Sequence, residues 1–489
     1  MNRERAIIDI GSNTVRLVIF GGPRRAPTML HNEKVTARLG KGVAEDGLLS
    51  DKAMAAALKA LGRYAKLLEL RGVNDVQTVA TAAVRDAANG GEFLEKVRET
   101  GLSPRLLSGE EEALTSAAGI VGAFPGAKGV VADLGGGSLE LVHVAGPGCE
   151  RGASLPFGTL WLPQLRADGP DKFARRVRKA LVATEWQCTE GEALYLVGGS
   201  HRALARLAIR QSQWPLGDPH GFELASEAVQ QVCRSALHGG VPAAMQGVSA
   251  SRLAALPNTA ALLSVLLREI RPSSVVFSAW GLREGLLYQS LEQAEQARDP
   301  LLEGIGAFVE SHGCARETGA MIAQWIAQVP PAVDERAGKL RLAATMLILA
   351  AQQIEPNLRV GHALDWALHK RWIGLDESGR AMIAASVAGH SGSSELPTEL
   401  YRLASQDDLC TAFIWGLAIR LCRRFSALSP VVLAGSTLRA DQGKLSLALD
   451  PSLAALVNEG TEKDLRNLAE SLELQPCIEI KSSEAMLVG

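Results

Sequence analysis

The sequence predicts an α/β fold with mixed sheets and an internal duplication, followed by a helical region and a small C-terminal α+β segment. Three observations support this prediction. Strand-like and helix-like runs alternate up to about residue 290. One Asp-x-Gly turn between two apolar runs occurs twice, at Asp9–Thr14 and Asp133–Ser138. From Leu301 to about Leu428, almost every segment has the periodicity of an amphipathic or buried helix.

The α/β part is read from apolar runs that are bounded by turn residues. The expected strands are Ala6–Ile10, Val15–Phe20, Val76–Ala80, Arg105–Leu107, Val130–Asp133, Leu139–Val144, Ala193–Val197 and Ser274–Ser278. The expected helices are Asp51–Arg71, Gly91–Thr100, Glu110–Val121, Lys172–Thr184, His201–Ile209, Thr259–Ile270 and Leu282–Ala294. A hairpin at each repeated turn makes the predicted sheets mixed rather than purely parallel.

The remainder of the chain is predicted to be mostly helical. Examples are Leu340–Ile354 and Ala381–Ala388, and the last sixty or so residues hold strands Leu445–Leu449 and Ile478–Ile480 around helix Glu462–Leu472. A chain of 489 residues exceeds one hydrophobic core. We therefore expect four domains, at residues 1–124, 125–298, 299–430 and 431–489.

Composition excludes several classes of protein. Apolar residues make up 47% and charged residues 21%, as in soluble globular proteins, and the net charge of −2 gives no basic field for nucleic acid or an anionic membrane. The seven cysteines are dispersed without metal-binding spacing, which favours reduced thiols. The longest apolar stretch, Leu342–Ala351, is too short to cross a bilayer. We expect a soluble cytoplasmic protein.

The two repeated turns are candidate phosphate-binding sites. Residues Gly11, Ser12, Asn13 and Thr14 form the first turn, and residues Gly135, Gly136, Gly137 and Ser138 form the second turn. Backbone N–H groups and hydroxyls in such turns can hold phosphate oxygens. Asp9 and Asp133, which precede the turns, would face each other across a cleft and hold a divalent cation such as Mg²⁺.

The acidic segment Ser108-Gly109-Glu110-Glu111-Glu112 has both a structural and a catalytic interpretation. Ser108 and Glu111 have the spacing of a capping box, and acidic residues in a first turn suit the helix dipole. Glu112 is not needed for the cap and projects about 100° away from Glu111. It could be a surface residue or the base that deprotonates a water molecule.

Three further motifs could line an anion site. Arg85 follows the strand that ends near Thr81 and could hold a phosphate, or it could form a surface ion pair. Gly198-Gly199-Ser200 joins a strand to a helix, and the N-terminus of that helix is compatible with an anion. Phe277–Gly285 ends a strand and could form a wall of the cleft, although packing at a helix start also explains it.

In combination, these motifs resemble the Ppx/GppA family of exopolyphosphatases and guanosine pentaphosphate phosphatases, within the actin-like (ribonuclease H-like) superfamily. The resemblance spans residues 6 to about 290. The stretches that carry it are DIGSNTVRL, RLGKGVAEDGLLS, ATAAVRDAAN, LSGEEEA, DLGGGSLELV, LVGGSHRALA and SAWGLREGLLY. It implies two actin-like domains, an HD-like helical domain that supports a homodimer and extends the substrate channel, and the small C-terminal segment.

The resemblance also implies roles for individual residues. Glu112 matches the base that activates water, Asp133 and Glu140 match catalytic acids at the metal and phosphate centre, and Asp9 matches the first-turn aspartate. The residues that match phosphate-contacting positions are Ser12, Asn13, Arg85 and Gly135 to Ser138. The implied reaction is Mg²⁺-dependent hydrolysis of a terminal phosphoanhydride of inorganic polyphosphate. The alternatives are hydrolysis of pppGpp, and a regulator that binds guanosine polyphosphates without turnover.

The sequence departs from the family pattern at several positions. Leu139 replaces an expected Thr, and Arg252-Leu253-Ala254 replaces an expected Arg-Ala-Asp. Leu347-Ile348-Leu349-Ala350 occupies the place of the His-Asp pair of HD hydrolases. His362, Asp365 and His369 share one helix face, but without that pair we expect core or interface histidines rather than a metal site.

Basic residues on two predicted helices could guide a long polyanion. One helix carries Arg175, Arg176, Arg178 and Lys179, and the other carries Arg202, Arg206 and Arg210 at i, i+4, i+8 spacing. The alternative is that both are ordinary solvated helix faces.

Overall fold

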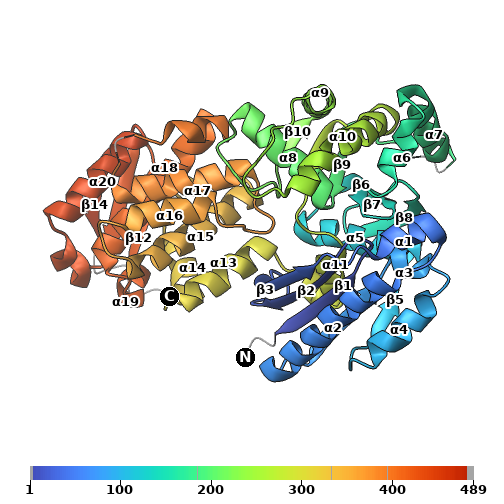
Figure 1. The fold of residues 1–489 in the computed structure, drawn as a ribbon. Helices are drawn as coiled ribbons and strands as arrows, with labels where there is room; N and C mark the ends of the chain where they lie inside the picture. The colour runs from blue at the N-terminus through green and yellow to red at the C-terminus, as the bar shows by residue number, and fades with distance from the viewer. Residues whose placement is uncertain (1–3, 184–185, 332, 394, 482–489) are drawn as a thin grey trace. The chain divides into compact units, whose positions relative to one another are not determined.

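The computed structural model describes residues 4–183, 186–331, 333–393 and 395–481 (Figure 1). The chain forms two compact units, residues 1–300 and residues 301–489. Each unit is described by itself below. The finer division into four domains stays a prediction.

The first sheet belongs to the N-terminal unit and is mixed. Its spatial order is β3 (Thr28–Val35), β2 (Val15–Gly21), β1 (Arg5–Ile10), β4 (Asp75–Ala80) and β5 (Pro104–Leu106). Strands β1, β2 and β3 form an antiparallel meander, whereas β4 and β5 run parallel to β1. The mixed character follows from the β1–β2 hairpin, as predicted.

The second sheet repeats this plan. Its order is β10 (Glu223–Ala225), β11 (Ser274–Phe277), β9 (Ala193–Val197), β6 (Lys128–Leu134), β7 (Leu139–Ala145) and β8 (Gly148–Leu155). Strands β6, β7 and β8 form the antiparallel meander, and β9 runs parallel to β6. The β6–β7 hairpin therefore corresponds to the β1–β2 hairpin.

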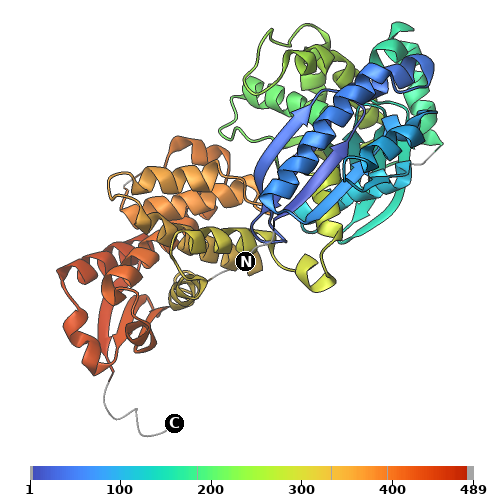
Figure 2. The ribbon, with the colours of Figure 1, turned by 60° about the horizontal axis from the view of Figure 1, so that its bottom comes forward.

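Helices cover the outer face of the first sheet. Helix α2 (Asp51–Arg71) runs along the strands in Figure 2, with α4 (Gly90–Arg98) beside it in the same core. The core side chains include Ile8 and Leu17 of the sheet, Leu61 of α2 and Phe93 of α4. Two short helices lie in connections: α1 (Leu39–Asp46) lies between β3 and α2, and α3 (Ala82–Arg85) lies between β4 and α4.

The outer face of the second sheet is covered by a larger set of helices. They are α6 (Leu162–Ala167), α7 (Pro170–Val182), α8 (Gly199–Ser212), α9 (Ser226–Leu237) and α10 (Ala250–Ile270). Helix α10 is long and apolar enough to cross a membrane by composition alone. Its side chains Leu256, Leu263 and Leu266 are, however, buried against this sheet, which accounts for its apolar character as a core helix.

Two helices form a layer between the sheets. Helix α5 (Gly109–Ala123) packs on the inner face of the second sheet, and α11 (Leu282–Gln289) packs on the inner face of the first. Their backbones approach closely, because a Cβ atom on Gly285 would lie 1.8 Å from the carbonyl oxygen of Thr115. Each half of the unit thus contributes a helix to the other half. A short helix, α12 (Gln293–Gln296), follows.

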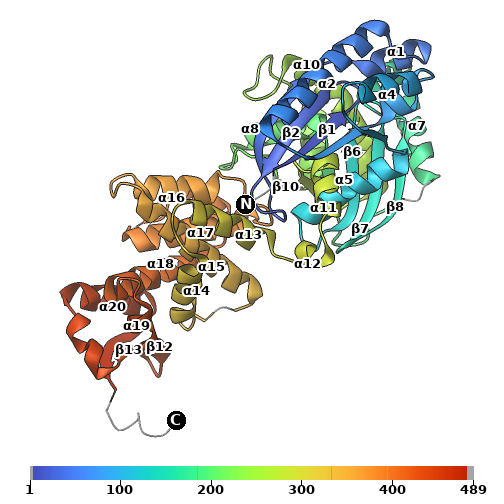
Figure 3. The same cartoon turned by 90° about the horizontal axis from the view of Figure 1, so that it is seen from below.

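The C-terminal unit is mostly helical and ends in a small sheet (Figure 3). Its helices are α13 (Pro300–Ser311), α14 (Arg316–Trp325), α15 (Glu335–Ala350), α16 (Arg359–Leu368), α17 (Glu377–Ser391), α18 (Gln406–Ser426), α19 (Pro430–Ala434) and α20 (Glu459–Ser471). Three 3-10 turns lie at Ala351–Gln353, Thr398–Arg402 and Pro451–Leu456. The sheet has the order β12 (Ser436–Asp441), β13 (Lys444–Leu449) and β14 (Gln475–Ile480).

Several expected elements need correction. The sequence does not predict strands β3, β8, β10 and β12 or helices α1, α3, α6, α9 and α19. For β3 and β8 the reason is that both are sheet-edge strands whose polar or glycine-containing sequences lack a clear apolar alternation. Helix α10 begins nine residues before the expected Thr259, because it contains Pro257, which sequence reasoning treats as a helix break. The helix expected at Leu282–Ala294 ends at Gln289.

Candidate active site

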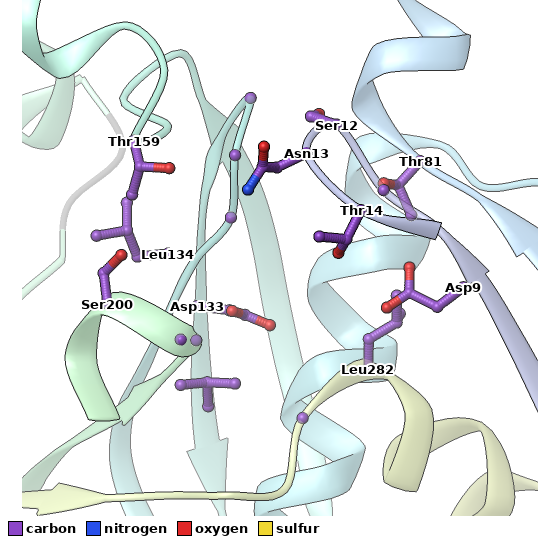
Figure 4. Close-up of a pocket in the computed structure, with 18 of the residues that line it drawn as sticks. Asp9, Ser12, Asn13, Thr14, Thr81, Asp133, Leu134, Thr159, Ser200 and Leu282 are labelled. Carbon is purple, nitrogen blue, oxygen red and sulfur yellow. The ribbon is translucent and has the colours of Figure 1, made fainter. Parts of the chain in front are cut away.

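A cleft of about 560 Å³ lies between the two halves of the N-terminal unit. Both predicted turns line it, as do the carboxylates of Asp9, Glu112, Asp133 and Glu140. Figure 4 shows Asp9 and Asp133 on opposite sides of this space, with their carboxylates directed into it. The structure therefore brings together the acids that the sequence singled out.

The two turns have the same hydrogen-bonded geometry. The backbone N–H of Gly11 donates to the carbonyl oxygen of Thr14 at 3.0 Å, and the N–H of Gly135 donates to that of Ser138 at 3.0 Å. In the strand register, Asp9 pairs with Arg16 in the first hairpin, and Asp133 pairs with Glu140 in the second. The duplicated backbone thus carries opposite charges at one equivalent position.

The two turns also touch each other. A Cβ atom on Gly136 would lie 2.9 Å from Cβ of Ser12, and one on Gly137 would lie 3.0 Å from Oγ of Ser12. A Cβ atom on Gly158 would lie 2.2 Å from the carbonyl carbon of Gly137. Glycine is therefore required here so that the backbones can approach one another.

Asp9 and Asp133 are held differently. The Oγ of Ser116 donates a short hydrogen bond to Asp133, whereas the closest cation to Asp9 is Arg283, with Nε 4.0 Å from Oδ2. Burial raises the pKa of both carboxyls, whereas Arg283 lowers the pKa of Asp9 and the hydrogen bond from Ser116 lowers that of Asp133. A cation or an adjacent donor is needed to keep such carboxylates ionised.

Glu112 points into the cleft rather than to solvent. Its neighbours confirm the predicted capping box, because Oγ of Ser108 accepts from the N–H of Glu111 at 3.1 Å and Glu111 accepts from the N–H of Ser108 at 2.8 Å. The Glu112 side chain is 13% exposed, and Nη1 of Arg85 donates to its Oε2 at 3.0 Å. Burial raises the pKa of Glu112 to about 7, and Arg85 opposes that rise.

Glu140 is the most deeply buried of the four acids. Oγ of Ser154 donates to its Oε1 at 2.9 Å. Burial, followed by the charges of Glu112 and Asp133, raises its pKa well above the ordinary value. The adjacent Leu139, which departs from the family pattern, is fully buried in the core of the second sheet and does not contact the cleft.

Six cations line the same cleft, and the sequence pointed to two of them, Arg202 in the possible polyanion track and Arg283 in the possible cleft wall. The six cations are Arg16, Lys34, Arg38, Arg202, Arg252 and Arg283. Burial and then the charge of Arg283 lower the pKa of Arg16 and of Arg202 to about 10. The Nε atom of Arg16 is buried without a hydrogen-bond partner in the described part of the chain. A concentration of cations that repel one another indicates a site for a polyanion.

The predicted anion site at the start of α8 also faces the cleft. Gly199 and Ser200 line it, and Gly198 has a φ of 107°, which favours glycine. A Cβ atom on Gly199 would lie 2.5 Å from Nη2 of Arg252. The helix N-terminus and this guanidinium therefore contribute positive potential at the same point.

The basic residues of α7 lie elsewhere. Nε of Arg178 is 2.8 Å from Glu269, and Nη2 of Arg176 is 3.8 Å from Asp168. These side chains are exposed, as are Arg175 and Lys179, and the cleft is not lined by any of them. Of the second basic set, Arg202 faces the cleft whereas Arg206 and Arg210 do not.

The donor set of the cleft fits Mg²⁺. Carboxylate oxygens of Asp9 and Asp133 face the cleft from two sides, and Mg²⁺ is held by one or two carboxylates together with phosphate and water oxygens. Within the described ranges, no three or more His, Cys, Asp or Glu residues form a ready-made metal cluster. His362, Asp365 and His369 lie within these ranges, and the ring centroid of His362 lies 6.3 Å from that of Trp366.

Comparison with known proteins identifies relatives of this unit. A sequence model of the Ppx/GppA phosphatase family matches residues 18–294. The crystal structure of the Aquifex aeolicus Ppx/GppA family member is 25% identical, covers 61% of this chain and 100% of its own, and has a TM-score of 0.53. An exopolyphosphatase from Cytophaga hutchinsonii is 21% identical, covers 59% of this chain and 97% of its own, and has a TM-score of 0.50.

These findings confirm the predicted fold class. Two mixed sheets form actin-like domains, and a helical region and a small three-stranded sheet follow them. The family match covers more than half of the sequence and includes Glu112, Asp133, Glu140 and the second turn, whereas Asp9 and the first turn precede the matched residues. The chain belongs to the Ppx/GppA phosphatase family.

Proposed function

We propose that the protein hydrolyses the terminal phosphoanhydride of inorganic polyphosphate and releases orthophosphate. The observation that carries this proposal is the cleft in which cations, two glycine-containing turns and buried carboxylates occur together. Phosphoryl transfer depends mainly on positioning and on stabilising charge at the phosphate oxygens. The cations would bind the polyanion, and the turns would hold its terminal phosphate.

In this proposal Glu112 is the general base. A carboxyl with a pKa of about 7 is substantially ionised at neutral pH and still basic enough to take a proton from the attacking water. Arg85 fixes the orientation of the carboxylate through the 3.0 Å contact. The water would then attack the terminal phosphorus in line with the leaving phosphate oxygen.

Asp9 and Asp133 would hold Mg²⁺, with Glu140 beside them. The bound ion would neutralise charge on the phosphate oxygens. Ser116 keeps one Asp133 oxygen in a fixed direction, and Ser154 does the same for Glu140. Their role is to orient the two acids toward the cleft.

Phosphate release from long-chain polyphosphate and from pppGpp, measured side by side with Mg²⁺, tests the proposal. Glu112→Gln should lower kcat on polyphosphate by about 10²- to 10⁴-fold. Glu110→Gln is the matched control, because Glu110 lies in the same helical turn but is exposed. Full activity in Glu112→Gln would contradict the assignment of Glu112 as the general base. Release from pppGpp alone would replace the proposed substrate, and tight binding of pppGpp without release would indicate a sensor.

A further inference from the structure

A second cavity lies within the helical unit, formed by α15, α16 and α17. Its volume is about 220 Å³. Ile348, Val360 and Val387 contribute apolar walls, whereas Gln352, Arg359 and His390 supply polar groups. An apolar slot with a few convergent polar groups is the usual form of a small-molecule site.

His390 connects the cavity to a guanidinium behind it. Nη1 of Arg423, on α18, lies 2.8 Å from Nε2 of His390. Arginine is always the donor, so Nε2 accepts and Nδ1 carries the hydrogen of a neutral ring. Burial and then the charges of Arg423, Arg420 and Arg359 lower the pKa of His390 to about 3, which is consistent with a neutral imidazole.

The positive charge around this cavity is not balanced locally. Asp464 pairs with Arg420 at 3.1 Å and with Arg424 at 2.5 Å. Arg359 donates to the carbonyl oxygens of Ile354 and Gln352, and within the described ranges neither it nor Arg423 pairs with a carboxylate. The Nε atom of Arg423 is buried and has no partner in the same part of the chain.

We propose that this cavity is a second, non-catalytic binding site for a small phosphate monoester with an apolar or aromatic body. The phosphate would lie against Arg359 and His390, with Arg423 supplying further positive charge, and the body would lie against Ile348, Val360 and Val387. A cavity of about 150 Å³ accommodates a benzene ring. The larger volume here leaves room for one charged group beside such a ring.

Isothermal titration calorimetry of the full-length protein with phenyl phosphate tests this site. Saturable binding is expected, and Arg423→Gln should weaken it by about tenfold or more, because it removes a buried positive charge next to His390. Arg424→Gln is the matched control, because it removes the same charge from the neighbouring position of α18. Benzyl alcohol tests the need for the anion, and equal binding of this uncharged ligand would overturn the proposal.

A second variant keeps the test valid if Arg423→Gln does not fold. Ala363 lines the cavity and is buried, so Ala363→Leu should fill the space and block phenyl phosphate without changing charge. Arg202→Gln, in the catalytic cleft, should leave this binding intact. The proposal fails if wild type shows no saturable binding. It also fails if Arg202→Gln abolishes binding that Arg423→Gln and Ala363→Leu retain. Phosphate release from polyphosphate is measured separately, so the two proposals can fail independently.

Discussion

The guanidinium Nη1 of Arg85 lies 3.0 Å from Oε2 of Glu112 and 3.1 Å from the carbonyl oxygen of Leu107. The second contact fixes the guanidinium, and the first then fixes the carboxylate. Burial and Arg85 act on the Glu112 pKa in opposite directions, and burial has the larger effect. Arg85 therefore sets both where the carboxylate points and the pH at which it becomes ionised.

The first prediction concerns the pH dependence of activity. Because the proposed base must be ionised, kcat/KM should rise with pH and level off above about 7. Arg85→Gln removes a charge that lowers the Glu112 pKa, so the rising limb should move to higher pH. Steady-state kinetics between about pH 5.5 and 9 would measure this shift, because that range extends at least about one pH unit on either side of the wild-type midpoint. A limb that stays in place in Arg85→Gln would contradict the assignment.

The second prediction concerns stability. The folded pKa of Glu112 lies above its ordinary value of 4.5, so between about 4.5 and 7 the folded protein binds more protons than the unfolded chain. This group therefore makes the free energy of unfolding fall as pH rises through that window. When unfolding by urea is measured without Mg²⁺, the decrease in the free energy of unfolding across this pH window should be smaller in Glu112→Gln than in the wild type. Glu110→Gln should preserve the wild-type slope, and an unchanged slope in Glu112→Gln would refute the prediction.

The third prediction concerns the cations of the cleft. Arg16→Gln should raise KM for polyphosphate and weaken the dependence of KM on salt concentration, because it removes one cation that faces the anion. Arg178→Gln removes the same charge from an exposed side chain of α7 that pairs with Glu269. Kinetics over a range of NaCl concentrations should separate the two variants. Equal effects would mean that only net charge matters.

The fourth prediction concerns the contact between α5 and α11. A methyl group at Gly285 would collide with the carbonyl oxygen of Thr115, so Gly285→Ala should lower the free energy of unfolding by about 1–3 kcal/mol. Gly62 lies inside α2 with open space around its Cβ position. Gly62→Ala should instead stabilise the protein by about 0.5–1 kcal/mol. Chemical denaturation of both variants checks the contrast, which would be absent if the helices could separate freely.

Local sequence predicted the parts of the site that depend on local geometry. The two turns and the Ser108 capping box are defined by residues within a few positions of each other, so their chemistry is visible in the sequence. Glu112 could be proposed because the cap did not need it. Its burial and its contact with Arg85, 27 positions earlier, required the fold.

Residues whose role depends on tertiary contacts could not be assigned in the same way. Arg202, Arg206 and Arg210 share one helix face by spacing, but only Arg202, at the start of α8, faces the cleft. Arg16 lies on a strand, where its pairing with Asp9 follows from the hairpin register. Lys34 lies on edge strand β3, which the sequence does not predict, so the position of Lys34 in the cleft could not be predicted either.

Arg16 in the first hairpin and Glu140 in the second occupy equivalent positions, so the two sides of the cleft carry opposite charges there. A polyphosphate chain has the same charge at every unit and differs only at its ends, so it offers no direction of its own. In the proposed function, Arg16 of the first hairpin would attract phosphate, whereas Glu140 of the second hairpin would repel phosphate unless a metal ion lay between them. Because the two ends of a linear polyphosphate are equivalent, the protein alone would define which part of the cleft receives the terminal phosphate.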